Sequence, residues 1–216
     1  MARKLVSVTL DNCGELPFPC RACTLWELGD STGSAAAKED WLSAVLLDWG
    51  SCGRMLYVDG EVAGFALYAP PAYVAGTSAL DATSVSADAV LLMTARILPP
   101  YRDAGLGRVL IQAVVKDALS RRGVKALEAF GDLQARGDRD ALSERCVMPA
   151  DFLTAVGFKT VGPHPRYPRF RLELRSVLSW RGDVEVALER WLGAIRPERA
   201  VGPVGVSPRM DGAGSD

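Results

Sequence analysis

The sequence RDAGLG, residues 102–107, decides the fold of this chain. It follows an apolar run over residues 89–98 and precedes an amphipathic segment that starts near Leu106. A strand, a tight glycine turn and a helix start together form a binding place for a pyrophosphate. Glycines let the backbone approach the ligand, and the first N–H groups of a helix have no partner inside it. The stretch therefore predicts a nucleotide-like ligand.

The helix after the glycine turn is predicted from the spacing of its side chains. Apolar residues recur every four positions from Leu106 to Ala118, whereas positions 108, 112 and 116 are polar. This pattern is typical of a helix with one face in the core and the other in solvent. Gly123 is the expected C-terminal stop.

Three phosphate-binding motifs can be compared with this turn. A Walker loop requires Gly-Lys-Ser/Thr, which does not follow these glycines. A dinucleotide fingerprint requires a third small residue, and that position is Leu110. The pattern Arg/Gln-x-x-Gly-x-Gly/Ala fits without a mismatch, and it favours coenzyme A as the ligand.

The longer segment ILPPYRDAGLGR, residues 97–108, resembles the acyl-CoA-binding motif of the GNAT superfamily of N-acyltransferases. The expected order of elements is also similar to that family. A hairpin over residues 55–68 precedes the long strand and the glycine turn, and a strand over 124–130 and a helix over 149–158 follow. The resemblance covers roughly residues 50–175. It implies an α/β fold in a single GNAT domain, with a mixed, mostly antiparallel twisted sheet of about six to seven strands flanked by helices.

The expected organisation has three parts: a GNAT domain over residues 1–178, an appended helix over 179–195 and a disordered tail over 196–216. The tail is rich in Pro, Gly and Ser, which does not support a packed core. Other expected elements are strands over 4–10, 159–161 and 170–174, a helix over 38–49, and a surface loop over 69–88 beside the active cleft.

Composition limits the classes of partner. The chain has 216 residues, of which 49% are hydrophobic, enough for one packed domain. Its 25 basic residues balance 26 acidic ones, which argues against a nucleic-acid or membrane surface. No apolar run is long enough to span a bilayer, and the N-terminus is predicted to form a first strand and not a signal peptide. We expect a cytoplasmic protein that is a monomer or homodimer.

The five cysteines raise the question of a metal site. Cys20-Arg-Ala-Cys23 has the spacing of a zinc knuckle, and Cys52 or Cys146 can complete such a site. The chain lacks a second C-x-x-C pair, so idle thiols are favoured and no metal is expected. Cys20, Cys23 and Cys52 remain the weak metal candidates, and disulfides are not expected in a cytoplasmic protein.

The resemblance assigns roles to residues of the glycine turn. It implies that the pyrophosphate of acetyl-CoA, the co-substrate, binds the backbone N–H groups of seven residues: Arg102, Asp103, Ala104, Gly105, Leu106, Gly107 and Arg108. Ile97 and Leu98, at the end of the long strand, would pair with the pantetheine and polarise the thioester carbonyl. The implied reaction is transfer of an acetyl (acyl) group to an amine of a small molecule or a protein, by direct attack in a ternary complex.

The family's usual general acid is missing. Many members carry a Tyr four residues before the Gly of Gly-Phe, and that position here is Leu153. A non-catalytic acyl-CoA-binding module, with a regulatory or interaction role, is therefore the alternative function. The family also uses its N-terminal helical region to shape the acceptor pocket. Trp26, Glu27 and Trp41 are candidate contacts there, although the tryptophans are more simply explained as core.

The general base has two principal candidates. Glu128 interrupts an apolar strand face, which suits either a desolvated base or a salt-bridged glutamate. His164 is the only histidine but lies in a Pro-rich turn, where a structural role is favoured. Asp132 and Glu27 are further carboxylate candidates.

Overall fold

The computed structural model describes residues 2–30, 32–80, 84–135 and 146–178. The predicted helix over 179–195 and the predicted tail over 196–216 lie outside the described residues. They remain predictions, as does the domain boundary at residue 178.

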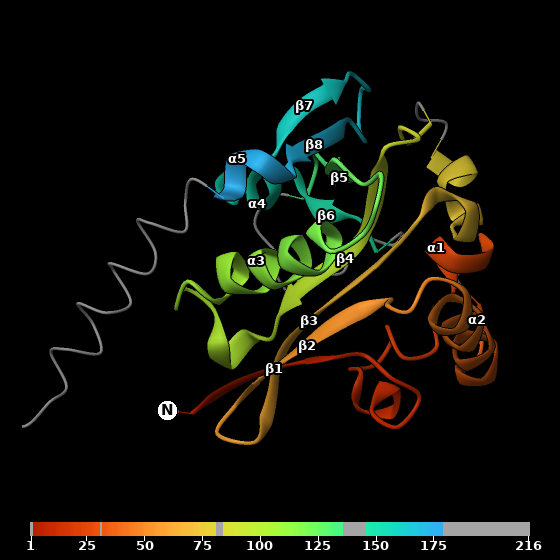
Figure 1. Ribbon diagram of the computed structural model, residues 1–216, viewed down its shortest axis with the longest axis vertical. Coiled ribbons are helices and arrows are strands. Elements are labelled where there is room, and N and C mark those ends of the chain that lie inside the picture. The colour runs from red at the N-terminus through yellow and green to blue at the C-terminus, as the bar shows by residue number, and fades with distance from the viewer. Residues whose placement is uncertain (1, 31, 81–83, 136–145, 179–216) are drawn as a thin grey trace, which may run out of the picture. The chain divides into compact units, whose positions relative to one another are not determined.

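An eight-stranded sheet runs through the described residues (Figure 1). Its order is β1-β2-β3-β4-β5-β8-β7, and the short β6 pairs with β5 outside this path. Only β4–β5 and β5–β6 are parallel, which confirms the predicted mixed, mostly antiparallel sheet. The strands are β1 (Arg3–Ser7), β2 (Gly53–Val58), β3 (Glu61–Ala69), β4 (Ala89–Ile97), β5 (Ala126–Asp132), β6 (Met148–Pro149), β7 (Lys159–Gly162) and β8 (Arg169–Glu173).

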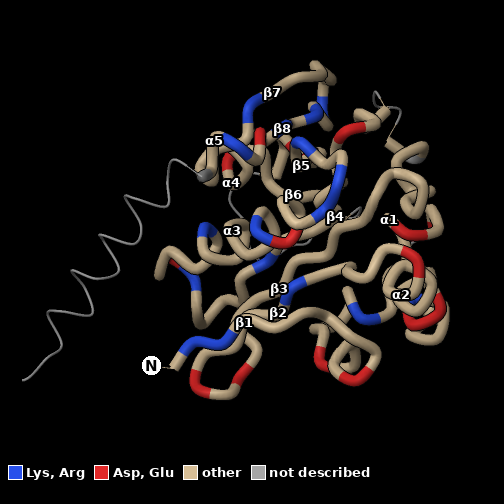
Figure 2. Tube along the Cα trace, viewed as in Figure 1, with Lys and Arg blue, Asp and Glu red and all other residues tan. Residues whose placement is uncertain are grey.

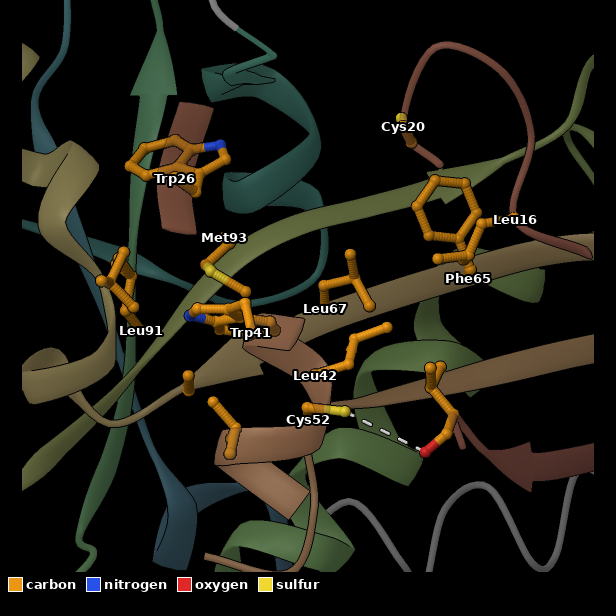
Figure 3. Close-up of a cluster of buried hydrophobic side chains, with 14 of the residues drawn as sticks. Leu16, Cys20, Trp26, Trp41, Leu42, Cys52, Phe65, Leu67, Leu91 and Met93 are labelled. Atoms are coloured by element: carbon orange, nitrogen blue, oxygen red, sulfur yellow. Dashed lines mark hydrogen bonds between the residues drawn. The ribbon is translucent and has the colours of Figure 1, made fainter. Parts of the chain in front are cut away.

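Helices cover both faces of this sheet. The α-helices are α1 (Leu25–Leu28), α2 (Ala35–Asp48), α3 (Leu106–Leu119), α4 (Ala150–Ala155) and α5 (Leu174–Leu178). Short 3-10 helices are η1 (Cys13–Glu15), η2 (Pro71–Tyr73), η3 (Ala75–Leu80) and η4 (Pro99–Tyr101). Side chains of α1 and α2, among them Trp26 and Trp41, pack in one buried cluster with Leu67 and Met93 of the sheet (Figure 3). Tyr68, the residue after Leu67, contacts α3, so α3 lies on the opposite face.

Local sequence explains the main elements. Asp59 and Gly60 both have positive φ, 51° and 92°, as a tight hairpin turn between β2 and β3 requires. Ser34 begins α2, because its side chain accepts a hydrogen bond from the Ala37 N–H at 3.1 Å. Charges of both signs are interspersed along the described chain (Figure 2).

Several expected elements differ in the structure. The helix predicted over 38–49 begins at Ala35, and the helix predicted over 149–158 ends at Ala155. β1 ends at Ser7 and not at residue 10, and β5 begins at Ala126 and not at residue 124. The segment over 69–88 is not simply a surface loop, because η2 and η3 lie within it. Val74 and Leu80 of this segment are 2% and 4% exposed. Its apolar residues are separated by small and turn-forming ones, and this spacing hides the buried positions in the sequence.

A polar network fastens the end of α3 to the sheet. Asp117 accepts hydrogen bonds from the Arg54 guanidinium at 2.6 Å and from the Tyr68 hydroxyl at 2.9 Å. Tyr68 is fully buried, and Ser51 lies 3.0 Å from the same hydroxyl. Burial raises the pKa of Tyr68, so the hydroxyl stays protonated and donates to Asp117.

Replacement of Asp117 by Asn tests this network. We expect the free energy of unfolding in urea to fall by about 2 kcal/mol, because Arg54 and Tyr68 lose their charged acceptor in a partly buried place. The exposed Asp40 on α2 provides the matched control, and Asp40→Asn should change stability by less than about 0.5 kcal/mol. Equal effects of the two substitutions would contradict the assignment.

Candidate active site

The parallel strands β4 and β5 separate after a short contact. They pair through Ala89↔Ala126, Val90↔Leu127 and Leu91↔Glu128. Beyond Leu91, β4 continues to Ile97, and no described strand pairs with it on the β5 side. The pairing of β4 with β3 passes from Leu92 directly to Thr94, so Met93 is an extra residue in a β-bulge. The separation leaves an open strand edge in the middle of the sheet.

The backbone groups on this edge follow from the register. The Leu98 N–H donates to the Ala63 carbonyl at 2.8 Å, so the backbone of Leu98 faces β3. Backbone groups alternate between the two sides of an antiparallel strand, and Ala95 and Ile97 therefore face the open edge. The backbone of Ile97 therefore faces the side on which the predicted pantetheine contact would lie, whereas the Leu98 N–H is engaged with β3. The Ile97 carbonyl also accepts from Arg102 Nε at 3.3 Å.

The glycine turn joins this edge to the start of α3. Asp103 and Gly105 have left-handed φ values of 60° and 71°, and residues 103–105 are exposed. Gly105 is the N-cap of α3, and no side chain caps the helix there. The first N–H groups of a 14-residue helix therefore open at the end of the β4 edge, the arrangement that suits a phosphate group.

The two glycines of the turn have different roles. A Cβ placed on Gly105 would meet no protein atom within 4 Å, so the space beside it is open to a ligand. A Cβ on Gly107 would lie 2.9 Å from Phe152 Cε2 of α4. The packing of α3 against α4 therefore also favours glycine at position 107, and the predicted role of Gly107 in the approach to the phosphate stays a prediction.

The charged side chains of the turn also contact the protein. Arg102 reaches the Ile97 carbonyl, and an Arg108 guanidinium nitrogen lies 3.3 Å from the Ala155 carbonyl at the end of α4. Leu106 is buried, so only its backbone can contribute to a ligand site. These contacts hold the turn between β4, α3 and α4.

Valine substitutions distinguish the roles of Gly105 and Gly107. Gly105→Val should lower coenzyme A affinity at least tenfold and cost about 1–2 kcal/mol of stability, because its side chain enters the open space from a left-handed backbone. Gly107→Val should destabilise the fold by about 2 kcal/mol or more, since it displaces Phe152. Calorimetry with coenzyme A and urea unfolding give the two readouts. Unchanged coenzyme A affinity in Gly105→Val would contradict the assignment.

A small cavity lies on the α1 and α2 face of β4. Leu67 of β3 and the bulge residues Met93 and Thr94 of β4 form its floor. Trp26 lies in its wall, where the indole ring stacks on Phe130 of β5 with centroids 6.1 Å apart. The cavity therefore adjoins the open edge of β4 from the face opposite α3.

A buried ion pair forms another part of the cavity wall. Glu27 of α1 and Lys38 of α2 are each 3% exposed, and the Lys38 ammonium donates to Glu27 Oε1. Buried charges are paired because an isolated one is costly to desolvate. Glu27 is the single carboxylate among the described residues that line the cavity.

Three thiols complete the cavity wall: Cys20, Cys23 and Cys146. The sulfur atoms of Cys23 and Cys146 lie 3.7 Å apart. The hydrogen bond from Cys146, a backbone N–H at Leu25 and the charge of Lys38 together lower the pKa of Cys23 to about 6, whereas burial raises the pKa of Cys20. The same hydrogen bond and burial raise the pKa of Cys146.

Cys20, Cys23 and Cys52, the weak metal candidates, do not form one group of possible ligands in the described part of the chain. Cys52 lies apart from Cys20 in Figure 3, with its sulfur 4.0 Å from the Val8 carbonyl. Burial raises the pKa of Cys52 to about 12, so this thiol stays protonated. Within the residues that the structure describes, no three His, Cys, Asp or Glu side chains are placed to hold a metal ion.

Glu128 is fully buried at the point where β4 and β5 separate. Its Oε2 accepts from the Arg169 guanidinium and the Ser86 N–H, both at 3.0 Å, and its Oε1 accepts from Arg171 at 3.0 Å. These contacts correspond to the salt-bridged alternative. Both carboxylate oxygens are engaged inside the protein, and Glu128 does not line the cavity.

The remaining acid–base candidates also make structural contacts. His164 Nδ1 accepts from the backbone N–H groups of Arg166 at 3.1 Å and Tyr167 at 2.7 Å, so this nitrogen stabilises the turn between β7 and β8. Asp132 accepts from the Gln134 N–H at 2.8 Å. Leu153 is fully buried in α4, which places an apolar side chain where the family's Tyr is expected.

Replacement of Glu128 by Gln distinguishes its two interpretations. If the ion pairs define its role, the free energy of unfolding should fall by about 3 kcal/mol, because two buried guanidinium groups lose their counter-charge. The pH dependence of any turnover should keep its shape. A stable variant whose turnover is lost and whose pH–rate profile changes would instead identify Glu128 as the base.

A sequence model of the acetyltransferase (GNAT) family matches residues 21–138, which is more than half of the chain. The chain belongs to the GNAT family of acetyltransferases. Acetyl-CoA is the acyl donor of this family, and the resemblance noted at residues 97–108 is confirmed. No curated protein sequence matches this GNAT chain.

Solved structures share its fold. YncA of Salmonella typhimurium, solved with its cofactor acetyl-CoA, aligns with a TM-score of 0.54 and 16% identity over 81% of this chain and 95% of that one. The loading GNATL domain of CurA from Lyngbya majuscula gives 0.53 and 13% over 82% and 100%. The ribosomal-protein-S18-alanine N-acetyltransferase of Escherichia coli gives 0.50 and 14% over 80% and 94%. These similarities establish the GNAT fold.

Some features of this GNAT site were not predicted from sequence. Lys38 and Thr94 line the cavity, yet nothing in their local sequence distinguishes them from ordinary surface or strand residues. Glu27 is predicted both as a contact in the acceptor pocket and as an outlying carboxylate candidate. A charged residue next to Trp26 in a short helix was the one available signal.

None of the described helices is both long enough and apolar enough to cross a membrane.

Proposed function

We propose that this chain transfers an acetyl group from acetyl-CoA to an amine of its acceptor, by direct attack in a ternary complex. Membership of the acetyltransferase (GNAT) family supports acetyl-CoA as the donor. The observation that carries the proposal is the open β4 edge, which ends at the uncapped N-terminus of α3. A strand edge that leads to the start of a helix suits a long ligand. The edge can pair with an amide-containing arm, and the helix start can bind a pyrophosphate.

The residues of the chain fit such a ligand. In the proposal, backbone N–H groups of residues 102–108 bind the pyrophosphate, and the open space beside Gly105 admits it. The backbones of Ala95 and Ile97, which face the open edge, pair with the pantetheine arm. Acetyl-CoA, when bound, supplies the thioester whose acyl group is transferred. The protein contributes by holding the reactants together and by hydrogen bonds to the developing oxyanion.

The acceptor amine is proposed to enter from the cavity on the other face of β4. Met93 and Thr94 belong both to the β4 bulge and to the cavity, so an amine held there lies beside the strand that binds the donor. Glu27 is the carboxylate in this wall, and we assign it the role of proton acceptor. Lys38 holds that carboxylate in place through the buried ion pair. The amine must lose a proton before or during attack on the thioester.

The buried Leu153 favours a second candidate function, a non-catalytic acyl-CoA-binding module. With an apolar side chain at this position, no hydroxyl stands where the family's Tyr would protonate the leaving thiolate, and the Thr154 hydroxyl of α4 donates to the Ala150 carbonyl at 3.0 Å. In the catalytic proposal, the thiolate departs as such or takes a proton from water. Release of free coenzyme A in the presence of an amine library distinguishes the two functions. No release with any amine, together with tight coenzyme A binding, would support the binding module.

Two glutamates provide a matched test of the base. Glu27→Gln and Glu128→Gln each neutralise a buried, ion-paired carboxylate, but only Glu27 lines the cavity. We expect Glu27→Gln to lower kcat about 100-fold with unchanged coenzyme A affinity, as for the loss of a general base. Glu128→Gln should lower stability and leave kcat within about threefold of the parent. The reverse pattern would contradict the role of Glu27.

A further inference from the structure

The wall of the acceptor cavity contains a pair of thiols that the proposed acyl transfer does not use. Cys23 lies just before α1, and Cys146 lies just before β6. They are 123 positions apart in sequence, yet their sulfur atoms are 3.7 Å apart. A disulfide has a sulfur–sulfur distance of about 2.05 Å, so the two sulfur atoms, now 3.7 Å apart, must move closer together to form one.

The surroundings of the pair divide the five cysteines into reactive and inert ones. Cys23 and Cys146 are partly exposed, whereas Cys13, Cys20 and Cys52 are 4%, 6% and 0% exposed. The pKa of Cys23 is lowered by its hydrogen bond with Cys146, by a backbone N–H at Leu25 and by Lys38. Burial raises the pKa of each of the other three, Cys13, Cys20 and Cys52. A partly exposed thiolate beside a second thiol is the arrangement of a redox-active pair.

One contact and one backbone feature distinguish Cys146. The Trp26 indole N–H donates to the Cys146 carbonyl at 3.3 Å, so the backbone of Cys146 contacts α1 directly. Cys146 also has a left-handed φ of 52°, a conformation that is uncommon outside glycine and typical of constrained sites. A bond between the two sulfurs would link the segment that leads into α1 with the segment that leads into β6.

We propose that Cys23 and Cys146 form a reversible disulfide site in the wall of the acceptor cavity, through exchange with a low-molecular-weight disulfide. The Cys23 thiolate attacks one sulfur of the small disulfide, which gives a mixed disulfide and releases one thiolate. The Cys146 thiol then attacks the Cys23 sulfur, forms the Cys23–Cys146 bond and releases the second small thiol with its proton. The two cysteines lose two electrons, the small disulfide gains them, and an external dithiol reverses both steps.

The disulfide has an expected effect on acyl transfer, which rests on the proposed function. Glu27 and Trp26 lie on α1, four and three residues after Cys23, and both line the cavity. A covalent bond at Cys23 therefore restrains the side of the cavity that receives the acceptor. The glycine turn and the open β4 edge carry neither cysteine, so coenzyme A affinity should not change.

Peptide mapping of the full-length protein tests the disulfide itself. The protein is equilibrated in glutathione buffers of increasing oxidised fraction, alkylated and digested with trypsin. Cleavage after Arg21, Lys38, Arg145 and Lys159 places Cys23 in residues 22–38 and Cys146 in residues 146–159, apart from Cys13, Cys20 and Cys52. We expect a cross-linked pair of these two peptides that dithiothreitol removes. A Cys20 cross-link in its place, or no cross-link in fully oxidised buffer, would overturn the proposal.

Three serine variants test which thiols form the cross-link. Cys20→Ser is the matched control, because it removes a cavity thiol outside the pair and should leave the cross-link intact. Cys23→Ser and Cys146→Ser should abolish it. In a further variant, Cys146→Ala, which has no donor at this position, alkylation of Cys23 by iodoacetamide at pH 7 should slow at least threefold, since the thiolate loses its hydrogen-bond donor. An unchanged alkylation rate would overturn the pairing of the two thiols.

Kinetics separate this proposal from the proposed function. We expect oxidation to change the acceptor KM at least threefold, reversibly, with unchanged coenzyme A affinity by calorimetry. An unchanged acceptor KM would overturn the effect on the acceptor. Absence of turnover in both forms would contradict the proposed function, whereas the peptide map would still report the disulfide.

Discussion

The separation of β4 and β5 is the constraint on which the rest of the site depends. Two parallel strands that pair through only three residues leave the remainder of β4 without a partner on that side among the described strands. Unpaired backbone groups in the centre of a sheet need another partner, and an extended ligand arm can provide it. The glycine turn and the uncapped start of α3 lie where this edge ends, so the edge and the helix start suit the binding of one extended ligand.

Glu128 lies at the point where the two strands separate. It occupies the last paired position of β5, and its two carboxylate oxygens hold Arg169 and Arg171 of β8. These ion pairs join β5 to β8, on the side away from β4. Beyond this point Phe130 of β5 stacks on Trp26 of α1, which directs β5 toward the helices that form the cavity. A residue that resembles a base in the sequence is thus better explained as an anchor of the sheet.

The same arrangement places groups that can bind a ligand on both faces of β4. The glycine turn and α3 lie on one face, and the ion pair of Glu27 with Lys38 and the thiols of Cys23 and Cys146 lie in the cavity on the other. The bulge at Met93 connects the two faces, because one strand forms both the open edge and the floor of the cavity. In the proposed reaction, donor and acceptor meet at this one strand and approach it from opposite sides.

The sequence by itself determined the elements whose signals are local. The Asp59-Gly60 turn, the period-four pattern of α3 and the glycine turn at residues 102–107 each follow from short-range stereochemistry, and together they indicated a GNAT fold. Only the tertiary structure decided which side chains share a site. Gly107 packs against Phe152, Glu128 pairs with Arg169 and Arg171, and Cys23 meets Cys146 across 123 positions. Such contacts depend on how strands and helices pack, and no local spacing encodes the distance between residues that far apart in the chain.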